Sequence, residues 1–210
     1  RAAARPALPG SESGVFLSNG ARFYIDGSHP EYASPETTNP WEAVRYALAG
    51  DSLMLQLAHE VRRNDPRLAT LAVRKGNVDY GGGTTFASHE NYLHHRPPAE
   101  LQPALAPHLV SRIVFTGAGG FDPFNRRRSR FVLSPRALFM RSVAATSAPG
   151  GLALVDGRAQ PHCAGFHRQH LVCADANRSH LSMFLRLGTT ALVVALIDAG
   201  CAEADEVKLV

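Results

Sequence analysis

The stretch Asn19-Gly-Ala-Arg-Phe-Tyr-Ile-Asp26 decides the fold. Asn-Gly between two apolar runs is the strongest short β-hairpin pattern, because both residues tolerate a positive φ. Side chains alternate along the strand that follows, so Arg22, Tyr24 and Asp26 face one side and the apolar residues face the other. This pattern predicts a strand with one core-facing side and one side that can bind phosphate, coordinate a metal or move a proton.

The region after this strand contains a predicted loop and a predicted helix. Gly27–Thr38 carries two prolines and is expected to be a loop. Asn39 is a suitable N-cap and Pro40 suits the first helical position, so a helix is predicted from there. The segment Arg62–Asp65 is expected to end it.

The rest of the chain mixes short strands with helices. Strands are predicted at Leu68–Arg74, Phe86–Leu93, Arg130–Leu133, Leu152–Val155 and His170–Ala174. Gly76–Thr85 is expected to be glycine-rich and flexible, and helices are predicted at Pro98–Phe115 and Ser179–Asp198. Because there is no regular βαβ alternation, we predict an α+β fold with a mainly antiparallel, curved sheet packed by helices.

Length and composition exclude several classes of protein. The chain has 210 residues, of which 45% are hydrophobic, enough for one domain or one large piece of one. The longest apolar run, Thr190–Ile197, is followed by Asp198 and falls short of the roughly 18 residues that a membrane span needs. No membrane partner is therefore expected. The start lacks Met and an apolar signal core, which indicates a fragment or a missing beginning.

Cysteine usage and charge indicate the compartment and the partners. Cys163, Cys173 and Cys201 are odd in number and form no Cys-x-x-Cys, which fits a reducing, cytoplasmic setting. The formal charge is +4. The arginine-rich run Arg126–Arg130 lacks interleaved aromatic residues, so no nucleic-acid partner is expected.

The densest polar cluster adds four residues to the Arg22–Asp26 face: His29, Glu31, Ser34 and Glu36. Three carboxylates beside an arginine and a histidine suit Mg²⁺, which takes one or two carboxylates plus substrate phosphates. A remaining carboxylate can act as a base or a nucleophile. The alternative is a solvated strand face followed by a polar loop.

A second cluster is Ser88-His-Glu-Asn-Tyr92. In a strand, His89 and Asn91 share a face and Glu90 points away. His89 is a candidate metal ligand and Asn91 a candidate hydrogen-bond partner for a nucleotide. The alternative is a capped strand end with a surface histidine.

A third cluster contains Arg158 and His162, followed by Arg168 and His170. An arginine fork here is suited to clamp phosphate. An exposed basic loop is the alternative that the residues alone leave open.

These clusters occur in an order that resembles the Pup ligase and depupylase family of the prokaryotic ubiquitin-like protein system, which includes proteasome accessory factor A-like proteins. The resemblance covers roughly residues 15–198. Its motifs are Asn19–Asp26, His29–Glu36, Ser88–Leu93, Val110–Gly119, Asp175–Asn177 and Leu187–Leu192. It implies a glutamine-synthetase-like (carboxylate-amine ligase) fold, here incomplete. The expected organisation is a loop remnant at 1–14, a partial catalytic domain at 15–200 and a tail at 201–210.

The resemblance also implies an enzyme that uses ATP and Mg²⁺ and acts at the C-terminal residue of Pup, with Pup and pupylated proteins as partners. Asp26 would be the catalytic aspartate. The implied or candidate nucleotide contacts are Arg22, Ser34, Asn91, Arg158 and His162, with His170 matching less closely, and the candidate metal ligands are Tyr24, Glu31, Glu36 and His89.

The spacing Asp26-Gly-Ser-His-Pro-Glu31 and the continuation Glu36-Thr-Thr38 resemble depupylases, which hydrolyse the C-terminal glutamine amide of Pup or the Pup–lysine isopeptide bond. Three alternatives stay open: a Pup–protein ligase, a divergent carboxylate-amine ligase, and a non-catalytic relative that binds a nucleotide or a Pup tail. The last is favoured by departures from the family pattern. The N-terminal Gly-x-Glu-x-Glu strand and the C-terminal part are absent, and acidic residues are missing after Arg158.

Overall fold

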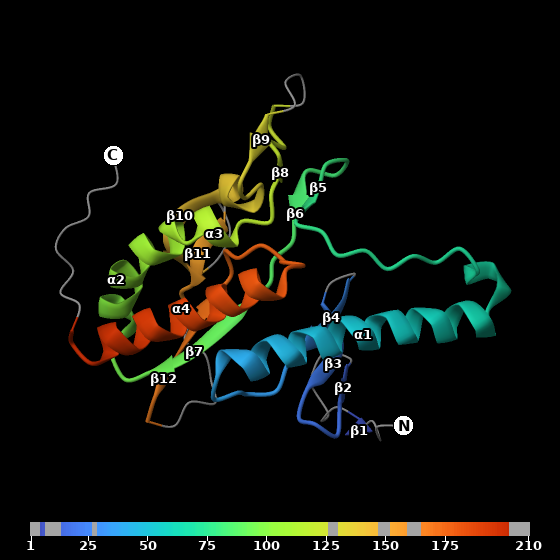
Figure 1. The fold of residues 1–210 in the computed structure, drawn as a ribbon, viewed down its shortest axis with the longest axis horizontal. Helices are drawn as coiled ribbons and strands as arrows, with labels where there is room; N and C mark the ends of the chain where they lie inside the picture. The colour runs from blue at the N-terminus through green and yellow to red at the C-terminus, as the bar shows by residue number, and fades with distance from the viewer. Residues whose placement is uncertain are drawn as a thin grey trace. The chain divides into compact units, whose positions relative to one another are not determined.

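The chain forms two compact units, Arg1–Arg74 and Lys75–Val210. The structure is a computed structural model that describes residues 5–6, 14–26, 29–125, 130–146, 152–158 and 165–201. Figure 1 shows the order of the elements along the chain. Each unit is described here by itself.

The first unit contains a four-stranded antiparallel sheet in the order β1-β2-β3-β4. Its strands are β1 (Arg5–Pro6), β2 (Gly14–Phe16), β3 (Arg22–Asp26) and β4 (His29–Ala33). The hairpin predicted around Asn19-Gly20 is confirmed: Gly20 has φ +85°, and the Asn19 side chain accepts a hydrogen bond from the Ala21 amide at 3.1 Å.

The predicted loop at Gly27–Thr38 is wrong over five of its residues, because β4 occupies His29–Ala33. Pro30 was the reason for expecting a loop, since proline cannot donate to a strand ladder. Here β4 is the last strand of the sheet, and edge strands tolerate proline. Within the loop expected at the N-terminus, the described residues Arg5–Pro6 form β1.

The helix α1 (Pro40–Asn64) is confirmed at both ends. The Asn39 side chain accepts from the Glu42 amide at 3.0 Å, which satisfies one of the amides left open at a helix start. Gly50 lies against the ring of Tyr32, and a Cβ at this position would collide with that ring. The helix therefore packs on β4 at a point where only glycine fits.

The predicted strand at Leu68–Arg74 is wrong. A short 3-10 helix, η1 (Pro66–Leu68), opens the segment, and no strand follows it before residue 78 in the described chain. The stretch Gly76–Thr85 contains a small hairpin of β5 (Val78–Asp79) and β6 (Thr84–Thr85) in place of the expected flexible run. A strand pattern without a pairing partner is not enough to form a strand.

The second unit is built on a sheet in the order β10-β11-β12-β7. Its strands are β7 (Glu90–His94), β10 (Met140–Ala145), β11 (Leu152–Asp156) and β12 (His167–Leu171). The other elements are α2 (Pro98–Ser111), α3 (Ile113–Thr116), β8 (Gly120–Phe121), β9 (Phe131–Val132), η2 (Arg136–Phe139) and α4 (His180–Asp198).

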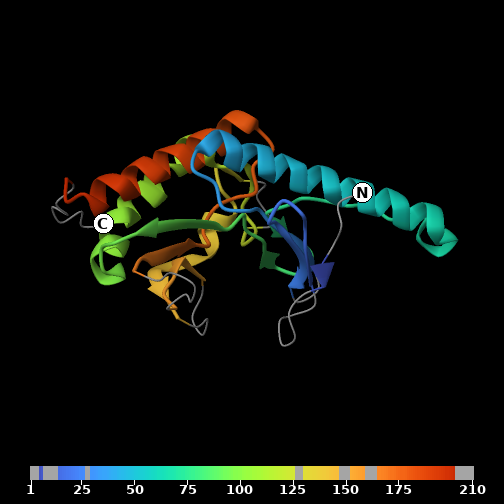
Figure 2. The same cartoon turned by 90° about the horizontal axis from the view of Figure 1, so that it is seen from below.

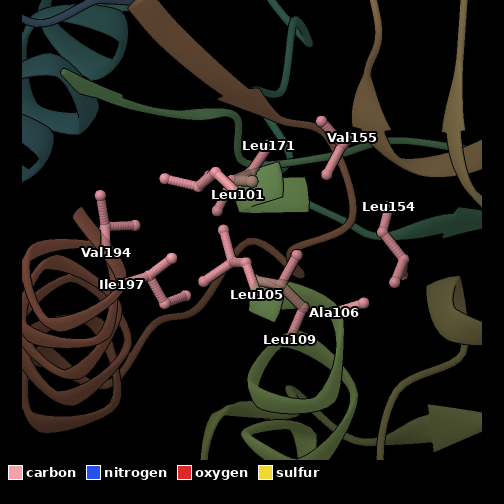
Figure 3. Close-up of a cluster of buried hydrophobic side chains, with 9 residues drawn as sticks. All are labelled: Leu101, Leu105, Ala106, Leu109, Leu154, Val155, Leu171, Val194 and Ile197. Atoms are coloured by element: carbon pink, nitrogen blue, oxygen red, sulfur yellow. The ribbon is translucent and has the colours of Figure 1, made fainter. Parts of the chain in front are cut away.

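The core of this unit lies between the sheet and its helices. Figure 2 shows α2 and α4 side by side on one face of the sheet. Leu101, Leu105, Val155 and Leu171 are completely buried there (Figure 3). Burying a leucine side chain stabilises the fold by about 1.5–3 kcal/mol. This packing fixes which face of each strand is turned inwards.

Sequence patterns placed the longer elements of this unit, while the short β8 and η2 were not predicted and further differences remain. The helix expected at Pro98–Phe115 is divided into α2 and α3 at Arg112. The strands expected at Phe86 and His170 begin at Glu90 and His167. Strand β10 was missed, and its pairing with β11 is the one parallel pair among the described strands. A mainly antiparallel α+β architecture is confirmed.

The sequence was expected to contain no segment long enough to span a membrane. Helix α4 shows that this expectation is wrong by length and composition. Its 19 residues are long and apolar enough by length and composition alone. One such helix is weak support for a span, because core helices pass the same test. Arg186 and Thr190 of α4 are buried and the helix packs on β7 and α2, while 28% of its apolar window is buried and Leu192 is exposed.

Candidate functional site

The first group of predicted site residues lies on the β3–β4 hairpin. Tyr24 and Glu31 are directly opposite each other in the strand register, and Asp26 is opposite His29. The Tyr24 hydroxyl donates a 2.6 Å hydrogen bond to Oε2 of Glu31. The strand alternation read from the sequence thus brings a phenol and a carboxylate together across two strands.

Arg22 completes this row. Its guanidinium carbon lies 4.6 Å from the centre of the Tyr24 ring, a cation–π distance. Partial burial raises the pKa of Tyr24 well above its usual value, and the hydrogen bond to Glu31 raises it further. At neutral pH the phenol is therefore a protonated hydrogen-bond donor.

The other predicted residues of this unit lie outside that contact. Asp26 is exposed at the end of β3. Ser34 and Glu36 follow β4 in the segment that leads to α1, and both are exposed. The structure therefore brings together Arg22, Tyr24 and Glu31 and leaves the carboxylate of Asp26 accessible beside them on the same strand.

The second group lies on the face of the other sheet that points away from α2 and α4. We call this the polar face; it carries His89, Asn91, Asp156, Arg158 and His170. Asp156, His170 and Asn91 are register partners in a row across β11, β12 and β7. Nδ1 of His89 lies 3.3 Å from Nε2 of His170. The prediction that His89 and Asn91 share a face is consistent with this row.

The charges of the polar face are tightly paired. Arg158 holds both carboxylate oxygens of Asp156, with Nε at 2.9 Å from Oδ1 and Nη2 at 2.6 Å from Oδ2. These hydrogen bonds lower the pKa of Asp156 to about 2. Burial, with the neighbouring His89, lowers the pKa of His170 to about 4, so this ring is neutral at physiological pH.

Two residues of this unit were missed as functional candidates, Asp156 and Glu90. Asp156 had a recognisable pattern in Asp-Gly-Arg158, because an aspartate two residues before an arginine can hold that arginine with an Asx-type turn. Glu90 was correctly expected to point away from His89 and Asn91. Its partners were not foreseen, since they come from two distant helices.

Glu90 is the centre of a buried ionic network behind the polar face. Its carboxylate accepts from Arg112 at 2.8 and 3.0 Å and from the Tyr92 hydroxyl at 2.6 Å. Arg186 lies 3.5 Å away, and Thr190 binds Arg112 at 2.6 Å. Burial alone would raise the pKa of Glu90, but the two arginines outweigh it and the pKa is lowered. The network ties β7 to α2 and α4.

The described residues contain no group of three or more His, Cys, Asp or Glu side chains that could hold a metal ion. The oxygens of Tyr24 and Glu31 nevertheless suit part of a Mg²⁺ coordination sphere, which water and phosphate commonly complete. The ring nitrogens of His89 and His170 are not the oxygen donors that Mg²⁺ prefers. The metal role of His89 stays a prediction. His162 lies outside the described residues.

Two clefts of the second unit lie away from the predicted site residues. One of about 420 Å³ is lined by the loop Gly117–Gly119 and by the start of α4, and another of about 410 Å³ lies between α2, α3 and β10. None of the predicted site residues lines either cleft.

Comparison with known proteins assigns the chain to a protein family. A family model described as Pup-ligase protein matches residues 2–209. The chain belongs to the Pup-ligase family. Within it, a Pup deamidase/depupylase from Mycobacterium tuberculosis (strain CDC 1551 / Oshkosh) is 39% identical over 196 residues, 90% of this chain and 38% of that relative. A Pup--protein ligase from Bifidobacterium longum subsp. infantis is 36% identical over 193 residues, 88% of this chain and 39% of that relative.

Solved structures extend the family assignment to the fold. The Pup ligase PafA in complex with ADP superposes with a TM-score of 0.75 at 29% identity, over 92% of this chain and 44% of that one. PafA in complex with Pup gives a TM-score of 0.73 at 28% identity, over 91% and 39%. The glutamine-synthetase-like fold expected from the sequence is confirmed. The chain spans about two fifths of the length of the relatives that it matches.

Proposed function

We propose that the chain carries the nucleotide- and Pup-directed chemistry of an ATP- and Mg²⁺-dependent depupylase. The reaction is hydrolysis of the C-terminal glutamine amide of Pup or of the Pup–lysine isopeptide bond. The observation that supports it most is the paired row on the β3–β4 hairpin, where Tyr24 and Glu31 face each other beside Asp26. The depupylase name of the Mycobacterium tuberculosis relative gives the substrate class. The lack of a paired-cysteine pattern leads us to propose a cytoplasmic setting.

In this proposal the first unit handles the reacting groups. Asp26 is the acceptor of a proton from water, or the nucleophile, because its carboxylate is exposed next to the row. Arg22 contributes positive charge toward phosphate, as arginine forks do. The oxygens of Tyr24 and Glu31 would contribute to holding Mg²⁺. When bound, the Mg²⁺ ion would supply positive charge that stabilises a developing oxyanion.

The second unit contributes binding groups. Asn91 is exposed on β7 and offers an amide that can both donate and accept hydrogen bonds. Arg158 is exposed and offers the remaining edge of its guanidinium to phosphate while Asp156 holds the other edge. That PafA was solved with ADP supports a nucleotide as the ligand.

The chemistry balances as an amide hydrolysis. The carbonyl carbon gains a bond to oxygen from water and loses its bond to nitrogen. The leaving nitrogen takes a proton and departs as ammonia from the glutamine amide, or as the lysine amine from the isopeptide. Asp26 accepts the proton from water and returns one to the leaving nitrogen.

The test is direct. The natural protein is incubated with Mg²⁺, ATP and Pup ending in glutamine, and separately with a pupylated protein. Mass spectrometry then follows the conversion of amide to acid and the release of Pup. Either product supports a depupylase. Absence of both products, with nucleotide still bound, would contradict it.

A Pup–protein ligase is the second candidate. It is favoured by the ligase relative and by the structural similarity to PafA. The same mixture with Pup ending in glutamate and an acceptor protein separates the two activities, because only a ligase joins them and converts ATP. A non-catalytic binder would retain ADP and give no product in either assay.

A further inference from the structure

The hairpin β8–β9 of the second unit carries exposed apolar side chains. Phe121 and Phe131 are register partners, and their rings meet edge to face with centres 6.5 Å apart. These residues are 51% and 64% exposed, and Leu133, which follows β9, is 49% exposed. We call these three residues the aromatic patch. Exposed apolar side chains that gather in one place commonly mark a binding surface.

The backbone that carries the aromatic patch is held by hydrogen bonds on both strands. The Tyr80 hydroxyl, next to β5, accepts from the Phe121 amide at 3.0 Å and donates to the Phe121 carbonyl at 3.1 Å. The Gly119 amide donates to the Leu133 carbonyl at 2.8 Å, which extends the ladder by one pair. Gly119 has φ +73°, and a Cβ there would lie 3.0 Å from Cζ of Phe131. Figure 1 shows this hairpin beside β5 and β6. The patch is therefore presented on a fixed backbone.

The segment that contains the aromatic patch is strongly basic. From residue 117 to residue 141 the sequence has six arginines and one acidic residue, a net charge of +5, whereas the whole chain carries +4. Arg136 is buried, and Arg126–Arg128 lie outside the described residues. The two others, Arg130 and Arg141, are exposed.

The exposed arginines of this segment differ from others in the chain. Among the described residues, no ion pair involves Arg130 or Arg141. Arg63, Arg67 and Arg96 each bind a neighbouring carboxylate. The positive charge beside the aromatic patch is therefore available to the carboxylates of another molecule.

We propose that the aromatic patch, with Arg130 and Arg141, is a docking surface for an acidic polypeptide segment of a partner protein. The segment places an apolar side chain on the patch and its carboxylates against the arginines. Aromatic residues and arginine are enriched where binding energy concentrates in protein interfaces. Carboxylates complement the charge of this segment, and such complementarity selects partners.

This inference goes beyond the proposed function, which uses the β3–β4 hairpin and the polar face. The aromatic patch also lies outside the motifs that carry the resemblance to the family, of which the nearest in sequence ends at Gly119. The occupant that we propose is therefore a protein other than Pup.

A single-stranded nucleic acid is the other class of ligand that aromatic and arginine side chains bind. Such a ligand stacks successive bases on open ring faces. The rings of Phe121 and Phe131 meet at an interplanar angle of 89°, so the edge of one ring points at the face of the other. This arrangement suits an apolar side chain better than a stack of bases.

The first measurement uses the natural protein and a fluorescein-labelled peptide in which glutamates flank a central leucine–phenylalanine pair. We expect binding in fluorescence anisotropy that weakens as the salt concentration rises, because salt screens exposed charges. Matched peptides with glutamine in place of glutamate, or with serine in place of the apolar pair, should bind at least about tenfold more weakly. Wild-type protein that binds the acidic peptide no better than both matched peptides would overturn the inference.

The second measurement compares Phe131→Ser and Arg130→Gln with two controls, Phe166→Ser and Arg45→Gln, which change an exposed phenylalanine and an exposed arginine elsewhere. We expect Phe131→Ser to weaken peptide binding at least about tenfold, Arg130→Gln about threefold, and each control less than about twofold. Arg130→Gln leaves the aromatic pair intact, so its effect does not depend on a disturbed hairpin. Equal effects of variants and controls would overturn the inference.

Pup and a labelled single-stranded oligonucleotide of uridines complete the test. Excess Pup should not displace the peptide, and both folded variants should deamidate Pup ending in glutamine at the wild-type rate. Displacement by Pup, or loss of deamidation in either folded variant, would place the patch in the Pup site and overturn the inference. Oligonucleotide binding that is tighter than peptide binding and is lost in Phe131→Ser would overturn it in favour of a nucleic acid. Wild-type protein that binds the peptide without deamidating Pup would contradict the proposed function alone.

Discussion

The two polar rows of this chain differ in what lies behind them. On β3–β4 the row of Arg22, Tyr24 and Glu31 is carried by a hairpin whose described residues include one fully buried side chain, Ala21, and an exposed Ile25. The polar face of the second unit is carried by strands whose other side faces a continuous core. A row of similar chemistry is therefore held by a local pairing in one unit and by tertiary packing in the other.

This difference predicts how far the structural effect of a substitution extends in each unit. On the hairpin, the polar side chains of the row contact each other, so a substitution acts on its immediate partner. In the second unit, Glu90 and Leu171 are register partners on the core side, one residue away from the Asn91–His170 pair on the polar side. A substitution in that core layer shifts the strand that presents the polar face.

The largest effect should come from breaking the buried network. Glu90→Gln leaves Arg112 and Arg186 buried with one carboxylate fewer, which we expect to lower the free energy of unfolding by about 3–5 kcal/mol. Urea denaturation measures this change. The control Glu60→Gln removes the exposed ion pair with Arg63 and should cost less than about 1 kcal/mol. Equal costs for the two variants would mean that the network does not hold the second unit together.

The next effect is a dependence of stability on pH. Burial lowers the pKa of His94, His108 and His170 below the ordinary value of 6.5. Below pH 6.5 the unfolded chain takes up protons that the folded chain does not, so these histidines make stability fall as the pH drops toward 4, and they add no pH dependence above about 7. Each such proton contributes up to about 1.4 kcal/mol per pH unit.

Amide hydrogen exchange at pH 7 and pH 5, corrected for the intrinsic exchange rates, tests the predicted loss of stability at low pH in each unit. We expect the greater loss of protection in β7 and β12 of the second unit. His94→Phe removes one titrating ring from a side chain that is 1% exposed and should make the loss smaller. A greater loss of protection on the hairpin would contradict the comparison.

The smallest effect should come from the hairpin. Tyr24→Phe removes the 2.6 Å hydrogen bond to Glu31, in a half-buried position, which should cost about 0.5–1.5 kcal/mol. Thermal denaturation measures it. Tyr46→Phe, on α1, is a suitable reference for losing a hydroxyl from this unit. A cost for Tyr24→Phe as large as that of Glu90→Gln would show that the hairpin depends on more than a local pair.

Local patterns predicted those parts of the molecule that depend on neighbouring residues. Asn19-Gly20 gave the hairpin, Asn39-Pro40 the start of α1, and alternation the common face of Arg22 and Tyr24. Strand β4 was missed because Pro30 argues against a strand unless the strand lies at an edge, and that position is a property of the whole sheet.

The remaining errors also concern long-range partners. Arg112 and Arg186 occur in predicted helices without any pattern that connects them to Glu90, which is 22 and 96 residues away. The contact between Asp156 and His170 likewise forms only when β11 and β12 pair. The sequence therefore predicted the strand faces and missed the carboxylates that hold them in place.

The most direct test of the proposed chemistry is Asp26→Asn. Asp26 is exposed, so the substitution should leave the fold and ADP affinity unchanged within about twofold, since surface substitutions rarely alter stability. Deamidation of Pup ending in glutamine and release of Pup should both be abolished in the mass-spectrometric assay. An Asp26→Asn protein that still converts the amide at the wild-type rate would contradict the account.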